Sequence, residues 1–204
     1  MIEREAKLGV DPSFVMPDLL GAVPGSIVEP APSQHLDATY YDNGVRRLAT
    51  LGSTVRYRTG EGADRWTVKL AGRAEGSSLA REEIDVEAPS DPVPPEVRSL
   101  VAAHLDSDAE LHPVARLVTD RTRLVVLAAT AARVAEIDDD LVVVYDGDRE
   151  VGCFRELEVE LAPGGSGDAL EAIVARLRES GAGEPDMTPK LVRALRMMSG
   201  GSAS

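Results

Sequence analysis

The chain has 204 residues, of which 43% are hydrophobic and 28% charged, and it carries a formal net charge of −13. This length and composition fit one globular domain that can bury a sizeable core. The negative charge argues against a broadly basic nucleic-acid surface and against adhesion to an anionic membrane, although it is compatible with a local basic pocket.

Cellular location and domain organisation follow from what the sequence lacks. No apolar run reaches the ~18 residues that span a bilayer, and the N-terminus begins a charged strand without the features of a signal peptide. Cys153 is the only cysteine, which excludes an intrachain disulfide, and its strand-like neighbours predict a small buried thiol. We expect a cytoplasmic protein with a single domain at 1–198 and a flexible tail at 199–204.

The first half of the chain predicts short strands interrupted by short helices. Alternating polar and apolar side chains indicate strands, Pro12 favours a helix start, and Gly52 favours a helix end. A glycine-rich turn at 60–64 predicts a hairpin. The expected strands are 2–10, 33–41, 54–59, 65–70 and 79–87, and the expected helices are 12–20, 44–51 and 96–104.

The second half predicts longer strands followed by two helices. The expected strands are 111–128, 132–138, 141–145 and 151–161, with a break or bulge at Asp139-Asp140, and the expected helices are 168–180 and 189–198. Strands joined in sequence by tight turns favour an antiparallel sheet, and eight or nine of them tend to close into a barrel. The sequence therefore predicts an α+β fold, an antiparallel β-barrel with helices packed outside.

Charged residues repeat at every second position in six of these strands. Alternate side chains of a strand share one face, so Glu3, Glu5 and Lys7 point the same way. The strands rich in bases contribute Arg56, Arg58, Lys69, Arg81, Arg121 and Arg123. The strands rich in acids contribute Glu3, Glu5, Glu136, Asp138, Asp140, Glu156, Glu158 and Glu160.

Each charged stretch by itself is compatible with a solvated strand face. In a closed barrel covered by helices, however, the charged faces would all point inward. Unmatched charges in a dry interior cost several kcal/mol each, so such a lumen must be wet. Bases of this kind neutralise polyphosphate oxygens, and carboxylates hold the divalent metals that accompany them.

Read in order, these motifs resemble those of the CYTH domains, also called triphosphate tunnel metalloenzymes. The matching segments are E-x-E-x-K at 3–7, Tyr40-Tyr41-Asp42, the arginine pair at 56 and 58, T-x-K at 67–69, R-x-E at 81–83, the arginines at 121 and 123, the acidic segment 136–140, E-x-E-x-E at 156–160 and Lys190. Asn43 departs from the usual Thr, and 118–120 is less basic than in many relatives. The resemblance implies an eight-stranded antiparallel barrel that holds a triphosphate and divalent metal in a tunnel.

The resemblance also implies roles for these residues in metal-dependent hydrolysis of a triphosphate, with inorganic triphosphate as the favoured substrate. One Mg²⁺ or Mn²⁺ is expected on Glu3, Glu5 and Glu158, and a second on Glu160 with Asp140 or Glu136. The expected phosphate clamp consists of Lys7, Arg56, Arg58, Lys69, Arg81, Arg121, Arg123 and Lys190. The acids at 3, 5, 158 and 160 together with Lys7 form the expected catalytic set.

Several alternatives remain open at this point. Within the family these are thiamine triphosphatase and class IV adenylyl cyclase, although the 3% aromatic content offers little to hold thiamine. Outside catalysis, the alternative is a silent module that binds polyphosphate or a nucleotide. Glu156 suits either the tunnel mouth or a supporting position. The C-terminal segment also resembles the junction to a helical CHAD domain, which implies a CHAD-type partner or a lost C-terminal domain.

Overall fold

The computed structural model describes residues 2–106 and 109–200. Its strands are β1 (Ile2–Val10), β2 (Ser26–Asp42), β3 (Thr54–Thr59), β4 (Arg65–Lys69), β5 (Arg73–Glu75), β6 (Ser78–Val86), β7 (His112–Ala128), β8 (Arg133–Asp146) and β9 (Arg149–Leu161). Its helices are α1 (Arg47–Thr50), α2 (Pro95–Val101), which continues into the 3₁₀ turn η1 (Ala102–His104), α3 (Gly167–Glu179) and α4 (Lys190–Gly200). No helix among these residues is long and apolar enough to cross a membrane.

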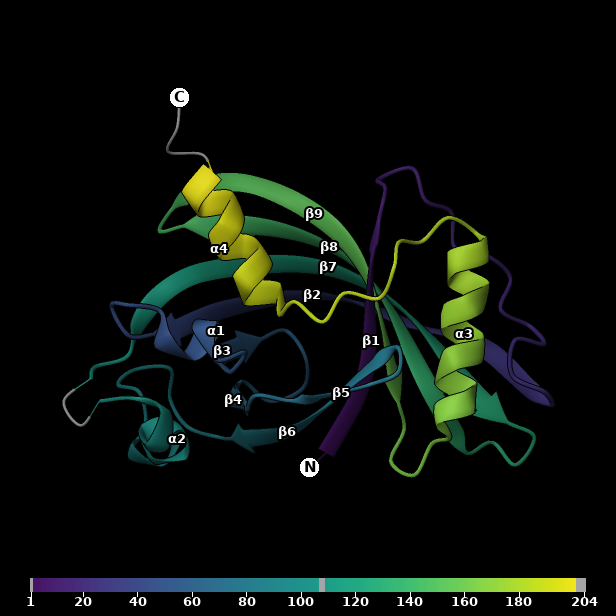
Figure 1. Cartoon of the computed structure of the whole chain (residues 1–204), viewed down its shortest axis with the longest axis horizontal. Helices are drawn as coiled ribbons and strands as arrows, with labels where there is room; N and C mark the ends of the chain where they lie inside the picture. Colours follow the sequence, from purple (N-terminus) through teal and green to yellow (C-terminus); the bar gives the residue numbers. More distant parts are fainter. Residues whose placement is uncertain (1, 107–108, 201–204) are drawn as a thin grey trace.

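The strands form one sheet that closes on itself (Figure 1). Within the described residues the sheet has nine strands in the order β1-β9-β8-β7-β2-β3-β4-β6-β5, and β1 also pairs with β6. All these pairs are antiparallel. The expected eight-stranded antiparallel ring is therefore confirmed, with the short β5 added beside β6 and with strands too unequal in length for a regular barrel.

Some element predictions are wrong for identifiable reasons. The segment 12–20 is a turn followed by irregular chain instead of a helix, because the Asp11 carboxylate accepts the backbone N–H of Ser13 and Pro17 interrupts any helical ladder. The strand expected at 33–41 begins earlier, at Ser26, because it pairs with the far end of the long β7. Strand β8 runs through Asp139-Asp140 without a break, and β5 was not expected.

The prediction for the C-terminal segment is also corrected in part. Ser199 and Gly200 belong to α4 and not to a tail, while residues 201–204 lie outside the described residues. Cys153 is exposed instead of buried. It precedes Phe154 on β9, so its side chain points to the face of the sheet opposite α4.

Three hydrophobic clusters hold the ring together, and they lie on different faces of the sheet. One cluster packs Leu8, Ile137 and Leu157 against α3. A second packs Val55, Trp66 and Val68 against α2. Both clusters use the outward-facing positions of the strands, which confirms for α2 and α3 that the helices cover the outside.

Helix α4 departs from this arrangement because it packs on the inner face. Its side chains contact Leu117 of β7 and Val142 and Val144 of β8. Val142 and Val144 share the strand face of Asp140, since their positions differ by even numbers. In Figure 1 α4 lies against one end of the arched β7–β9, while α3 lies toward their other end. The inner face is thus apolar where α4 covers it and charged beyond α4.

Candidate active site

A cavity of about 220 Å³ lies inside the ring, and its wall is almost entirely charged. The acidic lining residues are Glu3, Glu61, Glu83, Glu136, Glu158 and Glu160, and the basic ones are Lys7, Arg56, Arg58, Arg65, Lys69, Arg81, Arg121, Arg123 and Lys190. Tyr40, Thr54, Pro189 and Leu191 complete the lining. All predicted site residues are among them except Glu5 and Asp140, which are buried in the wall and contact lining residues.

Glu3 lies beside Lys69, which reaches it from β4 past the intervening strand β6. The Lys69 ammonium donates to both Glu3 carboxylate oxygens at 2.8 and 2.6 Å and forms a salt bridge with Glu83 at 2.6 Å. Burial, together with the charges of Glu5 and Glu83, outweighs Lys69 and raises the pKa of Glu3 to about 8. Glu3 is therefore a carboxyl group that holds a proton near neutral pH in the metal-free protein.

Glu5 points to the same side of β1 but is surrounded by cations. It forms salt bridges with Lys7 and with Arg81, and Lys7 also lies 3.3 Å from Glu158. Burial favours the neutral form of Glu5, but the charges of Lys7, Lys69 and Arg81 dominate and lower its pKa to about 2. Glu3 and Glu5 thus differ in protonation although they are alternate residues of one strand.

Arg121 connects the acidic strands from its place on β7. Its guanidinium donates two hydrogen bonds to Asp140, both at 2.7 Å, and it lies 2.6 Å from Asp138 and 3.1 Å from Glu158. The strand register explains the main contact, since Arg121 pairs directly with Asp140 across β7 and β8. A bidentate arginine–carboxylate pair is strong and geometrically specific, so Arg121 fixes the acidic wall.

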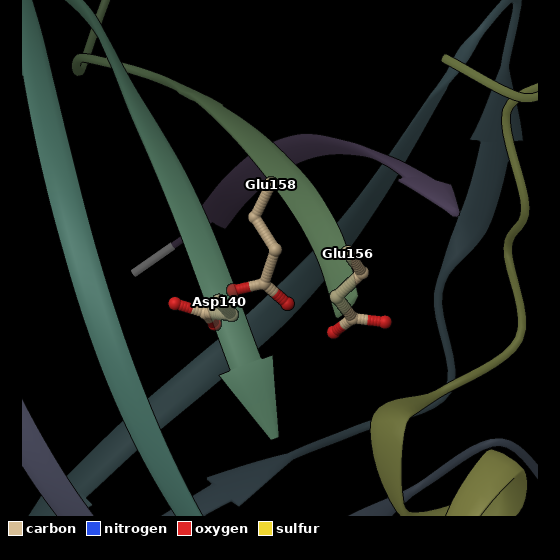
Figure 2. Close-up of side chains that lie close together, drawn as sticks. All are labelled: Asp140, Glu156 and Glu158. Atoms are coloured by element: carbon tan, nitrogen blue, oxygen red, sulfur yellow. The ribbon is translucent and has the colours of Figure 1, made fainter. Parts of the chain in front are cut away.

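Asp140, Glu156 and Glu158 converge where β8 meets β9 (Figure 2). One oxygen of each lies within 4.8 Å of the others. Lys190, the first residue of α4, places its ammonium 2.6 Å from Asp140, 3.2 Å from Glu156 and 3.5 Å from Glu158. Arg193 lies 2.9 Å from Glu156 on the other side. These carboxylates are therefore neutralised by α4, and Glu156 supports Lys190 from a fully buried position.

Arg56 differs from the other arginines of the cavity. It forms no salt bridge with any described residue, and its hydrogen bond goes to the Tyr40 hydroxyl at 3.4 Å. Its Nε is buried without a hydrogen-bond partner. Next to it, burial and the charges of Arg56 and Arg121 lower the pKa of Arg58 to about 10 despite Glu61. Positive charge is thus in excess at this part of the cavity, as an anion-binding site requires.

The sequence model of the CYTH domain family matches residues 1–191 of the chain. The chain belongs to the CYTH family. This confirms the resemblance seen in the strand motifs. The tunnel fold that the family implies is the closed ring described above.

Relatives of this CYTH chain extend the comparison. Two Mycobacterium tuberculosis proteins, uncharacterized protein MT2285 (strain CDC 1551 / Oshkosh) and uncharacterized protein Rv2226 (strain ATCC 25618 / H37Rv), are each 31% identical over 214 residues. The match covers 98% of this chain and 41% of each relative. The CYTH chain therefore spans about two fifths of the length of these curated relatives.

Solved structures show the same fold at low sequence identity. The PH1819 protein of Pyrococcus horikoshii OT3 has a TM-score of 0.52 at 16% identity, covering 96% of this chain and 98% of that one. HpAC1 of Hippeastrum, whose dominant activity is that of a triphosphatase, has a TM-score of 0.53 at 16% identity, covering 97% and 96%. At this identity the likeness concerns the fold.

The CYTH family is metal-dependent in general, and the donors of this tunnel fit a hard divalent cation. Glu160 lines the cavity and forms no salt bridge within the described parts of the chain. Burial and the nearby charges of Glu5, Glu83 and Glu136 outweigh the charge of Lys69 and raise its pKa to about 7. Mg²⁺ and Mn²⁺ prefer carboxylate oxygens, and a carboxylate close to other acids is a position where a cation relieves repulsion.

We expect the metal-free CYTH protein to lose stability as the pH rises from 6 to 9. Glu3 and Glu160 have pKa values of about 8 and 7, well above those of an unfolded chain. A raised pKa in the folded state stabilises the fold at low pH, and this contribution is lost as the pH passes through 7–8. Glu5, with its lowered pKa, contributes equally throughout this range.

Urea unfolding in EDTA at pH 6 and pH 9 measures this effect. The free energy of unfolding is expected to fall by at least about 1 kcal/mol, roughly the equivalent of one pKa unit. Saturating Mg²⁺ is expected to reduce the difference, because the cation replaces the proton. Equal or higher stability at pH 9 without metal would show that Glu3 and Glu160 are ionised throughout.

Three lining residues were not singled out from the sequence: Thr54, Glu61 and Arg65. Thr54 shares the strand face of Arg56, and Arg65 shares that of Lys69, so the alternation rule applies to both. Glu61 lies in the turn between β3 and β4, where no strand periodicity exists. Its position in the cavity depends on how the turn folds back.

Proposed function

We propose that this CYTH tunnel catalyses metal-dependent hydrolysis of a triphosphate, with inorganic triphosphate as the favoured substrate. The observation that carries the proposal is Arg56, a half-buried arginine that lines the cavity, makes no salt bridge with the described residues and has a buried Nε without a hydrogen-bond partner. A buried donor left without a partner costs free energy until an acceptor arrives. Arg58, Arg121 and Lys7 also line the same cavity, so several phosphate oxygens can be bound at once.

The carboxylates are proposed to hold the metal. Glu3, Glu5 and Glu158 are assigned to one Mg²⁺ or Mn²⁺, and Glu160 with Glu136 or Asp140 to a second. When bound, such ions neutralise phosphate charge and lower the pKa of a coordinated water. The protein's own part is to position the phosphate chain of the substrate with basic residues. This clamp is assigned as Lys7, Arg56, Arg58, Lys69, Arg81, Arg121, Arg123 and Lys190. Phosphoryl transfer depends mainly on such positioning and on charge stabilisation.

Ligand binding is proposed to replace the salt bridges of the ligand-free tunnel by contacts with metal and phosphate. Lys69 holds Glu3 and Lys7 holds Glu5 in the absence of ligand. When metal and triphosphate are both bound, the carboxylates would hold the metal and the ammonium groups would hold the phosphates. Neither ligand alone compensates both sets of charges, so each is expected to bind more tightly in the presence of the other.

The family alternatives are less well supported by the cavity. Tyr40 is the only aromatic side chain among the described lining residues, and its hydroxyl bonds to Arg56. This leaves no aromatic pair to sandwich a thiamine ring or an adenine base. The triphosphatase activity of HpAC1, which has the same fold, is consistent with hydrolysis of a triphosphate.

The second candidate function is a binding module without turnover. It is favoured by one observation, namely that Lys190 occupies the centre of the carboxylate cluster formed by Asp140, Glu156 and Glu158. If Lys190 stays there when phosphate is bound, one cluster of acids is closed to metal. The tunnel would then bind polyphosphate without activating water.

The deciding prediction is release of phosphate from tripolyphosphate in the presence of Mg²⁺ or Mn²⁺. Thiamine triphosphate and ATP are expected to be cleaved at least about tenfold more slowly, the equivalent of about 1.4 kcal/mol. EDTA is expected to abolish release, and added metal to restore it. Tight binding without release from any of the three compounds would reject hydrolysis in favour of the binding module.

A further inference from the structure

Glu61 is an acidic residue at the most basic part of the tunnel. Its carboxylate lies 2.5 Å from Arg58, 3.7 Å from Arg65 and 3.4 Å from Arg123. These arginines come from β3, β4 and β7, so three strands converge on one carboxylate. Gln34 of β2 adds a hydrogen bond to Glu61 at 3.3 Å. The side chain is mostly buried, with 18% of its surface exposed.

The turn between β3 and β4 is built to bring Glu61 back over the cavity. Gly60 has a φ of +95°, and a Cβ there would lie 2.0 Å from the carbonyl oxygen of His35. Gly62 also has a positive φ, +64°. Only glycine tolerates this close approach to β2 at residue 60, so the backbone next to Glu61 is shaped by its contact with the neighbouring strand.

Charge explains why an anion occupies this position. Arg56 and Arg121 add to the positive charge around Arg58, while Arg123 is shared with Asp138 and Glu136. One Glu61 carboxylate oxygen lies against Arg58 and Arg65 and the other against Arg123, which are positions where guanidinium groups also bind phosphate oxygens. A phosphate group that reaches Arg58 and Arg65 therefore competes with Glu61 for the same donors.

We propose that Glu61 is a specificity-determining residue that selects against long phosphate chains by competing for this arginine cluster. This inference rests on the proposed binding of a triphosphate in the tunnel. A triphosphate held by the clamp shares Arg58 and Arg123 with Glu61 and leaves the contacts of Glu61 with Arg65 and Gln34 in place. Longer chains extend further, to Arg65, and must displace the carboxylate from the whole cluster, so the penalty grows with the number of phosphates.

The test compares wild type with Glu61→Gln, which keeps the shape of the side chain and removes its charge. Dissociation constants for pyrophosphate, tripolyphosphate, tetraphosphate and a longer linear polyphosphate are measured by calorimetry, each with and without Mg²⁺. Glu61→Gln is expected to tighten tetraphosphate and longer chains by about tenfold or more, which corresponds to about 1.4 kcal/mol, and to change pyrophosphate less than about threefold. Asp64→Asn is the matched control, because it removes a charge from an exposed position in the same turn.

Each other outcome has a defined meaning. An equal gain for all chain lengths, or an equal gain in Asp64→Asn, would show a general charge effect and overturn the selection. No gain in Glu61→Gln, with urea unfolding showing an intact fold, would also overturn it. If neither wild type nor Glu61→Gln bound any phosphate chain, the proposed function and this inference would both be overturned, whereas binding of tripolyphosphate without an effect of chain length overturns this inference alone.

Discussion

Replacing Glu158 by glutamine is expected to lower kcat/KM for tripolyphosphate by about a thousandfold. Glu158 lines the cavity and interacts with Lys7, Arg121 and Lys190. Their charges hold its pKa well below its ordinary value, so it is fully ionised at neutral pH. A metal ion stabilises transition-state charge by several kcal/mol, and each 1.36 kcal/mol is a factor of ten in rate. Losing one of the proposed anionic metal ligands is therefore expected to have a large effect on rate.

The fold is expected to survive this substitution because its cationic neighbours have other partners. Lys7, Arg121 and Lys190 each lose one contact with Glu158. The remaining contacts are with Glu5 for Lys7, with Asp138 and Asp140 for Arg121, and with Asp140 and Glu156 for Lys190. No buried cation is left alone, so the free energy of unfolding is expected to change by less than about 1–2 kcal/mol.

Glu150→Gln is the matched control for Glu158→Gln, since Glu150 is exposed on the same strand, β9. It is expected to retain wild-type activity and metal affinity. In Glu158→Gln the metal concentration for half-maximal activity is expected to rise together with the loss in rate. Activity within tenfold of wild type at saturating metal would remove Glu158 from the metal site.

The placement of charged residues at alternate strand positions explains why much of the site is predictable from sequence. Glu3 and Lys7 reach the cavity for the same reason as Arg81 and Glu83, namely that alternate residues share a strand face. The rule needs no knowledge of which strands are neighbours. The contacts do need that knowledge, since pairing Lys69 with Glu3 depends on β1, β4 and β6 lying side by side in the closed ring.

The features that were missed depend on tertiary structure. Glu61 reaches the cavity through a turn whose shape is set by the carbonyl of His35, far from it in sequence. Helix α4 shows the same apolar spacing as an outer helix, yet it packs inside the ring because Val142 and Val144 make that end of the inner face apolar. Local sequence indicates which residues of a helix are buried but not which face of a sheet covers them.

Removing the charge of Arg121 is expected to have the largest effect on stability. Arg121→Met leaves Asp138, Asp140 and Glu158 without their shared cation in a buried wall, where Arg121 itself is only 7% exposed. Breaking a buried ion pair by removing one partner costs about 3–5 kcal/mol, and the lower end of this range is expected here because Asp138 keeps Arg123, Asp140 keeps Lys190 and Glu158 keeps Lys7. Urea unfolding at pH 7.5 is expected to show a loss of this size. Combining Arg121→Met with Asp140→Asn is expected to recover part of it.

Arg116→Met on the same strand provides the contrast. Arg116 also forms a bidentate pair, at 2.9 and 2.5 Å from Asp37, but the two side chains are 43% and 34% exposed. Water screens this pair, and exposed pairs contribute about 0.2–1 kcal/mol. The same chemical change is therefore expected to be several times less costly at Arg116 than at Arg121. Similar losses in the free energy of unfolding for Arg121→Met and Arg116→Met would mean that water enters the tunnel wall freely. The buried network around Arg121 would then position the acids without stabilising the fold.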